Sequence, residues 1–381
     1  MKKYDVLVIG GGPVGSHTAG ALAGTGVKVA VLEKRASLAG QICCTGLVST
    51  ECLERYPVDP ALILNRFNRA VLFSPAGRQI MVERTRVQAC AIERQGYDRW
   101  MAEKAVAAGV EYLTGHQVED IHIGSEGVSV EVGADGARQI FESRAVVLAC
   151  GFGSGLSEKA GMGKAGDWKM GVQADVELPG EQGVEIYLGK ALAPGSFAWL
   201  VPLQGRRGLV GLMAKRDARK KFENFRARLE IEGKIVEGSV KPRFRGITLK
   251  PPRRTFGERA LLVGDAAGQV KPISGGGIYY GLLCADIAAA CLKSALLEDD
   301  LSAGRLSSYQ RRWRTLLGKE ISTSYLAQKI YGSLNDYWLE RFFGMALKRG
   351  LLPALAGSEK LDFDWHSRVI IQAGRRFLFN R

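Results

Sequence analysis

Two adjacent cysteines, Cys43 and Cys44, stand within residues 41–49, which read QICCTGLVS. Such a pair could form a disulfide, hold a metal, present a reactive thiol, or fill a packed loop. A disulfide between sequence neighbours would be strained, and the seven cysteines include no CxxC pair and no His/Cys cluster with zinc spacing. We therefore expect no metal site and interpret Cys43 as a packing residue, while Cys44 keeps both a reactive and a packing interpretation.

A glycine motif with the spacing of a dinucleotide site lies close to the N-terminus. Residues 4–33 predict a buried strand at 6–9, the motif Gly10-x-Gly12-x-x-Gly15, a helix to about residue 23, and a second strand that ends in Glu33. The glycines permit a tight turn, close approach of a pyrophosphate, and packing of the helix on the strand. The helix N-terminus attracts the anion, and Glu33 can accept a hydrogen bond from a ribose hydroxyl.

A distant segment, residues 259–282, indicates which dinucleotide binds. A strand at 260–263 ends in Gly264-Asp265, and after a proline-bearing loop a glycine triplet at 275–277 opens a helix. The Asp265 carboxylate can hydrogen-bond a polyol chain, and the N-terminus of the helix can stabilise an anionic reduced flavin ring. An NAD domain needs no such partner, so the two segments together indicate FAD in an extended form.

The elements that must position these residues predict an α/β (α+β) protein. Residues 1–65, 85–165 and 248–300 carry a discontinuous, Rossmann-like FAD-binding domain. Residues 66–84 and 166–247 alternate apolar and polar side chains, as the antiparallel strands of a substrate sheet do, and 215–232 read as an amphipathic helix across that sheet. Residues 301–381 form a C-terminal helical region with aromatic residues among arginines, a pattern typical of core helices or of a lipid-facing surface.

Composition places the chain among soluble globular proteins with anionic partners. It has 381 residues, 46% of them apolar and 24% charged, and a formal charge of +14. Such a field favours nucleic acid, acidic lipid headgroups or a diphosphate ligand, and no nucleic-acid motif is present. No run approaches the ~18 apolar residues of a membrane span. The odd cysteine count indicates a reducing compartment, so we expect a cytoplasmic protein, with peripheral membrane attachment as an alternative.

Three further stretches extend these motifs into a resemblance. The glycine motif, Glu33 and Gly264-Asp265 resemble the para-hydroxybenzoate hydroxylase-type flavoproteins. Within that superfamily the chain is similar to the geranylgeranyl reductase family, especially the archaeal-lipid members known as digeranylgeranylglycerophospholipid reductases. The stretches that carry this narrower likeness are 44–49 (CTGLVS), 94–100 (RQGYDRW) and 194–202 (PGSFAWLVP). The likeness covers roughly residues 1–300.

The resemblance implies roles for particular residues. The Cys-x-Gly loop would lie beside the flavin, with Cys44 facing the substrate as a proton donor and Tyr279 as a second candidate donor; alternatively Cys44 only shapes the pocket, and water or the flavin supplies the proton. Phe197, Trp199 and Val201 would line a substrate tunnel, although Trp199 can equally be a core residue. The implied FAD contacts are Gly10, Gly12, Val14, Gly15, Glu33, Cys44, Thr45, Leu47, Arg94, Val118 (through its backbone), Asp265, Gly277 and Ile278.

Two departures from the family pattern bear on the reaction. The strand at 145–149 is followed by Cys150-Gly151-Phe152-Gly153 where the superfamily has an Asp-Gly motif associated with NADPH handling. The electron donor is therefore open between a low-potential, ferredoxin-like protein and NADPH. Phe197 and Val201 replace the usual Tyr and Phe, so the pocket is apolar but altered in shape.

The sequence as a whole predicts an FAD-dependent reductase that saturates isoprenoid double bonds by hydride transfer. The substrate would be a geranylgeranyl chain on a diphosphate, a glycerophospholipid or a quinone. Two alternatives share the scaffold: a flavin monooxygenase or halogenase, and an electron-transfer flavoprotein that serves the quinone pool. A halogenase would normally carry a Trp-x-Trp-x-Ile motif, which the chain lacks.

Overall fold

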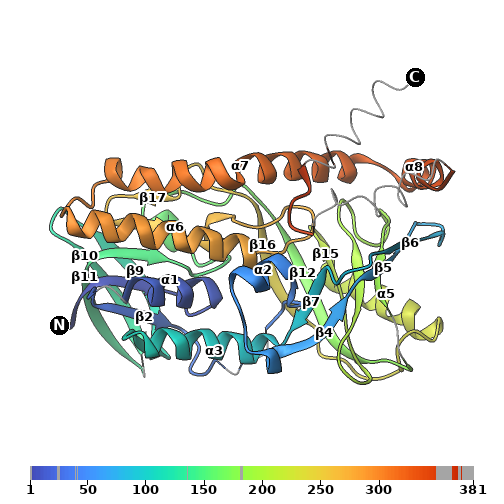
Figure 1. Cartoon of the computed structure of the whole chain (residues 1–381), viewed down its shortest axis with the longest axis horizontal. Coiled ribbons are helices and arrows are strands. Elements are labelled where there is room, and N and C mark those ends of the chain that lie inside the picture. Colours follow the sequence, from blue (N-terminus) through green and yellow to red (C-terminus); the bar gives the residue numbers. More distant parts are fainter. Residues whose placement is uncertain are drawn as a thin grey trace.

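The computed structural model describes residues 2–23, 26–38, 40, 42–134, 136–180, 183–348, 363–367 and 370 (Figure 1). The strands of these residues form sheets of eight, seven and three strands. Along the long axis of the molecule, the eight-stranded sheet occupies one end and the seven-stranded sheet the other, and two long helices, α6 and α7, run along one side (Figure 1).

The eight-stranded sheet has a parallel centre of nearly continuous apolar strands. Such runs are typical of strands that are covered on both faces, and every residue of β2 is buried. The sheet contains, in order, β17 (Phe256–Gly257), β18 (Ala260–Leu262), β11 (Ala137–Leu148), β1 (Lys2–Ile9), β2 (Val29–Glu33) and β8 (Glu111–Thr114), with β10 (Val128–Ala134) beside β11 and β9 (Gln117–Ile123) beside β10.

Helices cover one face of this sheet, and the β9–β10 hairpin covers part of the other. The helices α1 (Pro13–Ala23), α3 (Arg94–Ala107) and α6 (Ile278–Leu297) share an apolar core with β1 and β2. On the opposite face, Leu7, Leu32 and Val130 belong to a second core. The short helix α4 (Leu156–Lys159) contacts β9.

The seven-stranded sheet carries helix α5 (Ala218–Ile231) on one face. Its strands, in order, are β16 (Arg243–Lys250), β12 (Asp167–Glu177), β15 (Arg207–Ala214), β14 (Ala198–Pro202), β13 (Val184–Tyr187), β5 (Arg69–Phe73) and β6 (Gln79–Glu83). Alternate side chains such as Val172, Leu200 and Leu212 pack against Phe222 and Phe225 of α5. Because successive residues point to opposite faces, the intervening residues face away from α5.

A small sheet and several short helices lie between these two parts. The three-stranded sheet has the order β3 (Leu47–Ser49), β7 (Ala89–Ile92) and β4 (Ile63–Phe67), and near it lie α2 (Thr50–Arg55) and η1 (Pro60–Leu62). Leu47 and Ala91 of this sheet share an apolar cluster with Val201 and Trp199 of β14. The small sheet therefore packs on the face of the seven-stranded sheet that α5 leaves uncovered.

The C-terminal region is helical where it is described. Helix α7 (Ala303–Ser333) lies against α6, and α8 (Asp336–Lys348) follows it at the far end of the molecule (Figure 1). Much of the predicted helical region beyond residue 348 lies outside the described residues.

One expectation about membrane spans needs correction. By length and composition α6 could cross a membrane, although the sequence reading found no such run. Small apolar residues make α6 apolar enough to span a membrane. Of its most apolar 18 residues, however, 67% are buried inside the protein. Its contacts with α1 and α7 make it a core helix.

The second sheet also differs from the predicted pattern in one pairing. Strands β13 and β5 pair in parallel, with Val184 opposite Ala70, whereas the predicted sheet was wholly antiparallel. This pairing joins strands that are more than a hundred positions apart in the chain. No local turn motif connects them, so the sequence does not predict the pairing. Strand β16 also runs through residue 248, where the predicted FAD-binding domain resumes.

Candidate active site

The glycine motif turns tightly between β1 and α1. Gly10 has a φ of +107°, and a Cβ there would lie 2.5 Å from the Ala149 carbonyl oxygen. A Cβ on Gly15 would lie 2.0 Å from the Gly10 carbonyl oxygen, so both positions require glycine. A Cβ on Gly12 would meet no described atom within 4 Å, which leaves open space beside the helix N-terminus.

Glu33 is buried at the end of β2 and holds this turn. Its Oε2 accepts a hydrogen bond of 2.6 Å from the Gly11 N–H, and its Oε1 accepts from the backbone and side chain of Arg35, both at 2.9 Å. Burial opposes ionisation, but the hydrogen bonds from Arg35 and Gly11 outweigh it and lower the pKa of Glu33. The carboxylate predicted to bind ribose is therefore ionised and orders the motif itself.

The loop with the two cysteines lies between the FAD-binding part and the seven-stranded sheet. The Cys43 thiol donates to the Arg243 carbonyl oxygen at 3.3 Å, and Thr45 Oγ1 donates to Gln173 Oε1 at 2.8 Å. Burial raises the pKa of Cys43 to about 11, so its thiol stays protonated at neutral pH. All seven cysteines are free thiols.

Gly46 turns this loop with a φ of +71°. A Cβ at this position would lie 2.4 Å from the Ile92 carbonyl oxygen and 3.2 Å from Arg94 Cγ. The glycine thus brings the loop close to β7 and to Arg94.

The Cys44 side chain is part of a charged cluster. Arg94 is buried, is electrostatically coupled to Cys44, and pairs with Asp98 at 2.5 Å. Arg245, from β16, is electrostatically coupled to Cys44 and pairs with Asp265 at 2.6 Å. Asp265 and then Cys44 raise the pKa of Arg245, against the effect of burial.

These contacts continue as one network from one predicted FAD segment to the other. Arg35 Nη1 lies 3.6 Å from Asp98, so Glu33 connects through Arg35 and Asp98 to Arg94. We name the whole set the Cys44 network; it consists of Glu33, Arg35, Asp98, Arg94, Cys44, Arg245 and Asp265. Predicted site residues that are far apart in the chain thus lie in a single connected group.

The segment after β18 packs on the glycine motif. A Cβ on Gly277 would lie 2.7 Å from Asp265 Oδ1, and Val14 contacts Gly264 and Gly281. Asp265 lies in the short helix η2 (Gly264–Ala267). Helix α6 begins at Ile278 with no side-chain cap and no acidic residue in its first turn. Its N-terminus therefore keeps the positive end of the helix dipole for a ligand.

Strand β14 presents the predicted substrate residues on the face away from α5. The rings of Phe197 and Trp199 meet edge to face at 6.0 Å. The Trp199 ring lies over Gly211 of β15, where a Cβ would be 2.5 Å from Trp199 Cζ2. Val201 is 1% exposed, so it serves the core beneath this face, while Phe197 and Trp199 are half-buried.

Tyr279 occupies a different environment from Cys44. Its hydroxyl donates to Glu51 Oε1 at 2.6 Å, and its ring contacts Tyr56 and Trp365. Burial and Glu51 raise the pKa of Tyr279, which makes it a weaker acid. None of these contacts belongs to the Cys44 network, so the structure does not bring the two candidate proton donors together.

Two predicted FAD contacts lie in strands. Leu47 opens β3 opposite Ala91, and Val118 lies in β9 opposite Val132 at an irregularity in the strand pairing. Both side chains are half-buried in apolar clusters. A role for Val118 through its backbone is compatible with this irregularity, because such sites leave backbone groups without strand partners.

The sequence reading missed Arg35, Asp98, Arg245 and Gln173 as site residues. Asp98 could have been found, because it is four residues after Arg94 on a predicted helix and such pairs are neighbours. Arg245 and Gln173 are polar residues in alternating strands, and alternation alone does not show which face meets the cofactor. Their long-range pairings supply that information.

The residues around the Cys-Thr-Gly loop fit an FAD molecule. Arg94 Nε, Gln173 Nε2 and Trp199 Nε1 are buried donors without a hydrogen-bond acceptor among the described residues. Buried donors need partners, and a flavin ring offers acceptor oxygens and nitrogens. Open space beside Gly12, at the N-terminus of α1, suits a pyrophosphate, and the uncapped N-terminus of α6 suits an electron-rich ring edge. In the described part of the chain, no group of three or more His, Cys, Asp or Glu residues could hold a metal.

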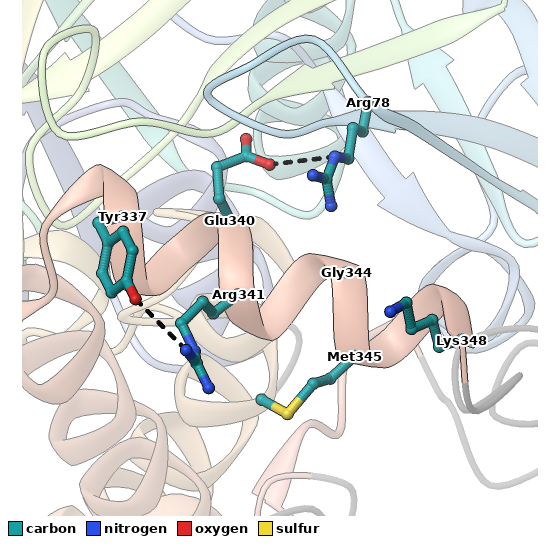
Figure 2. Close-up of a pocket in the computed structure, with 7 residues that line it drawn as sticks. All are labelled: Arg78, Tyr337, Glu340, Arg341, Gly344, Met345 and Lys348. Carbon is teal, nitrogen blue, oxygen red and sulfur yellow. Dashed lines mark hydrogen bonds and ion pairs between the residues drawn. The ribbon is translucent and has the colours of Figure 1, made fainter.

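A separate hollow lies at the far end of the molecule. It has a volume of about 370 Å³ and is lined by residues of α8 together with Arg78, which follows β5. Figure 2 shows Glu340 directed toward Arg78, with 3.5 Å between Glu340 Oε2 and Arg78 Nε, while Tyr337 and Arg341 contact each other. None of its lining residues belongs to the predicted FAD site.

Comparisons with known proteins agree with this geometry. The sequence pattern of the family described as "FAD binding domain" matches residues 3–317. Digeranylgeranylglycerophospholipid reductase of Methanocaldococcus jannaschii is 29% identical over 94% of this chain and 93% of its own length. Digeranylgeranylglycerophospholipid reductase 2 of Methanopyrus kandleri is 30% identical over 94% of each chain.

A solved structure shows the same fold. A geranylgeranyl bacteriochlorophyll reductase-like protein from Thermoplasma acidophilum superposes with a TM-score of 0.87 and 22% identity. The superposition covers 100% of this chain and 98% of the other. The predicted family, fold class and FAD cofactor are thereby confirmed.

Proposed function

The chain belongs to the FAD binding domain family and within it to the geranylgeranyl reductases, and from this premise we propose that it saturates double bonds of a phosphate-bearing geranylgeranyl compound. Its class, an FAD-dependent oxidoreductase, follows from the family. The observation that carries the proposal is the position of Cys44. Its loop lies between Arg94 of α3 and the seven-stranded sheet that holds Trp199.

The chemistry of an isolated alkene defines what the protein must supply. FAD, when bound and reduced, supplies a hydride to one carbon of the double bond, and the other carbon takes a proton. No carbonyl polarises such a bond, so proton delivery must accompany the hydride. We assign this proton to the Cys44 thiol, whose loop packs on Arg94 at Gly46.

The surrounding residues hold the reactants and exclude water. The apolar face of Phe197 and Trp199 suits an isoprenoid chain, because such sites are lined mainly by aromatic and aliphatic side chains. Asp265, which pairs with Arg245, would accept hydrogen bonds from the polyol chain of FAD. Exclusion of water by Trp199 and Val201 also protects the reduced cofactor from side reactions.

We propose a low-potential, ferredoxin-like protein as the electron donor, in preference to NADPH. The segment that lacks the Asp-Gly motif uses Phe152 to pack on Trp168, with ring centroids 5.4 Å apart. The Phe152 ring also packs on Gly246 of β16. A Cβ on Gly246 would lie 2.0 Å from the Phe152 ring. Anaerobic mixing tests this assignment: reduced ferredoxin should bleach the flavin absorbance within the time in which NADPH leaves it unchanged.

We also propose that the protein is cytoplasmic and attaches peripherally to an acidic membrane through α8 and the end of α7. Exposed apolar side chains gather there beside cations, as in helices that lie in a membrane interface. The apolar residues are Leu326, Ile330, Tyr337, Trp338 and Leu347, and the cations beside them are Arg341 and Lys348. Opposite charge would hold this surface to acidic headgroups, and the substrate lipids reside in the same membrane.

The reductase assignment is tested by products. The purified flavoprotein is reduced with dithionite without oxygen and mixed with geranylgeranyl diphosphate or an unsaturated archaeal-type lipid. We expect products that are heavier by two hydrogens for each saturated bond. No mass change with any isoprenoid, together with rapid flavin oxidation by oxygen through a transient adduct, would instead indicate a monooxygenase.

A further inference from the structure

Four lysines gather around one carboxylate at the end of the seven-stranded sheet. The carboxylate of Asp167, which is nearly buried, accepts from Lys329 Nζ at 2.6 Å and from Lys215 Nζ at 3.1 Å, and it also accepts from the Tyr325 hydroxyl at 3.1 Å. We name Lys169, Lys215, Lys250 and Lys329 the lysine cluster. They come from β12, the end of β15, β16 and α7, so four separate elements bring them together.

The lysine cluster has an excess of positive charge. Asp167 pairs with two of its members, and Lys169 and Lys250 form no ion pair within the described ranges. Lys169 is buried and donates to the carbonyl oxygens of Pro194 and Gly195. Burial, reinforced by Lys329 and Lys215, lowers the pKa of Lys169 to about 8, although Asp167 opposes this. An added anion would therefore be attracted to the cluster.

The cluster continues the face that holds the candidate substrate residues. Met213 and Ile247 lie against the glycine triplet before α6, since a Cβ on Gly275 would be 2.8 Å from Met213 Sδ. Lys215 directly follows β15, two residues after Met213, and its Nζ lies 3.1 Å from Asp167 of the neighbouring strand β12. Lys169 lies two residues before Gly171 in β12, so the two residues share a face of the sheet. The Gly171 carbonyl oxygen lies 3.8 Å from Cys43 Sγ.

Helix α7 fixes the same end of the face. Gln328 donates to the Gly195 carbonyl oxygen at 2.7 Å, and Tyr331 donates to the Ser196 carbonyl oxygen at 2.9 Å. These bonds tie the helix that carries Lys329 to the chain that enters β14. The side chains of Lys215 and Lys329 are 61% and 49% exposed, so a ligand can reach them from solvent.

An apolar face that ends in cations is complementary to a molecule with an apolar chain and an anionic head. We propose that the lysine cluster binds the phosphate of the substrate head while the isoprenoid chain lies along Phe197 and Trp199. The inference rests on the proposed function and specifies the chemistry of the head. A lysine ammonium binds phosphate as a point charge without one required geometry, so a diphosphate and a glycerophosphate share this recognition.

The test begins with binding to the FAD-loaded protein by calorimetry, with inorganic diphosphate as the probe. The variant is Lys215→Met combined with Lys329→Met, because both side chains are exposed, whereas substitution of the buried Lys169 would endanger folding. Lys319→Met, an exposed lysine earlier on α7, is the matched control. We expect about tenfold weaker binding in the double variant, the loss of roughly one charged hydrogen bond, and no change in the control.

Kinetics then separate the head from the chain. With geranylgeranyl diphosphate and with a digeranylgeranylglycerophospholipid, the double variant should show a KM raised about tenfold and little change in kcat. With uncharged geranylgeraniol, it should match the unsubstituted protein. The substrate whose KM rises more identifies the source of the phosphate.

Three results would overturn the inference. They are no diphosphate binding to the unsubstituted protein, equal binding in all variants, and an equal loss of activity toward geranylgeraniol and its diphosphate. Failure of the proposed function gives a different pattern: no isoprenoid is saturated by any form of the protein, while diphosphate binding and its loss in the double variant persist.

Discussion

Cys44 is electrostatically coupled to two arginines, Arg94 and Arg245. Both guanidinium groups have carboxylate partners of their own, Asp98 and Asp265. The charged residues around the thiol come from three elements: α3, β16 and η2. Single substitutions test whether Cys44 donates a proton, as we propose, or only shapes the pocket.

Cys44→Ser tests the role of the thiol. Serine has nearly the same size but is a much weaker acid, so we expect FAD to stay bound while turnover falls about 100-fold or more. Flavin content and the rate of alkene saturation are the measurements, and Cys43→Ser is the control because Cys43 only packs on β12 and β16. A Cys44→Ser protein with an unchanged rate would reduce Cys44 to a pocket-shaping residue.

Asp265→Ala tests the proposed cofactor contact. Loss of a charge-assisted hydrogen bond should weaken the binding free energy of FAD by about 1.5–3 kcal/mol. The affinity for FAD should therefore fall about tenfold or more. The measurement is the flavin absorbance that co-elutes with the protein on gel filtration. Glu126→Ala, at an exposed turn, should keep its flavin, and full flavin retention by Asp265→Ala would contradict the assignment.

At the scale of elements, the Trp199 ring depends on a glycine in the neighbouring strand. A Cβ on Gly211 would meet Trp199 Cζ2 at 2.5 Å and the Val172 carbonyl oxygen at 2.6 Å. The backbone contact cannot be relieved by a rotation of the indole. The flat face proposed for the isoprenoid chain therefore requires glycine at this position of β15.

Gly211→Ala should lower the free energy of unfolding by about 1–3 kcal/mol, the usual cost of overpacking. Gly238→Ala is the control, because a Cβ there would meet no described atom within 4 Å. Denaturant titration of both proteins measures the difference. Equal stability of the two variants would show that Trp199 does not lie on Gly211.

Local patterns in the sequence predicted the elements but not how they meet. The βαβ unit with Glu33, the Gly264-Asp265 segment and the helix at α5 follow from periodicity and glycine spacing, which act over short distances. The parallel pairing of β13 with β5 and the small sheet of β3, β7 and β4 join distant segments, so they leave no local signal. Arg245 was missed for the same reason, because only the fold brings it to Asp265.

At the scale of the whole molecule, the Cys44 network joins the two main sheets. Its acids and cations come from β2, α3, β16 and η2. The described C-terminal residues make two further long-range contacts. Asp364 forms an ion pair of 2.6 Å with the buried Lys271. Glu320 of α7 accepts a hydrogen bond from the Ser367 N–H. The C-terminal residues thereby contact both the loop before α6, through Lys271, and helix α7, through Glu320.

Attachment to membranes belongs to the same scale. Tyr337→Ala combined with Trp338→Ala should reduce co-sedimentation with acidic vesicles several-fold, because it removes exposed aromatic anchors of α8. Ile231→Ala, which changes an exposed apolar residue on α5, should have no effect. High salt should also release the unsubstituted protein. Equal sedimentation of all three proteins would exclude α8 as the contact.

The measurement that tests the central claim most directly is the stoichiometry of one anaerobic turnover. Protein with fully reduced FAD is mixed with less than one equivalent of a geranylgeranyl substrate, and flavin absorbance and product mass are followed together. We predict that one flavin is reoxidised for each double bond saturated. Flavin reoxidation without a saturated product, or no reoxidation until oxygen is admitted, would contradict assignment of the site as an alkene reductase.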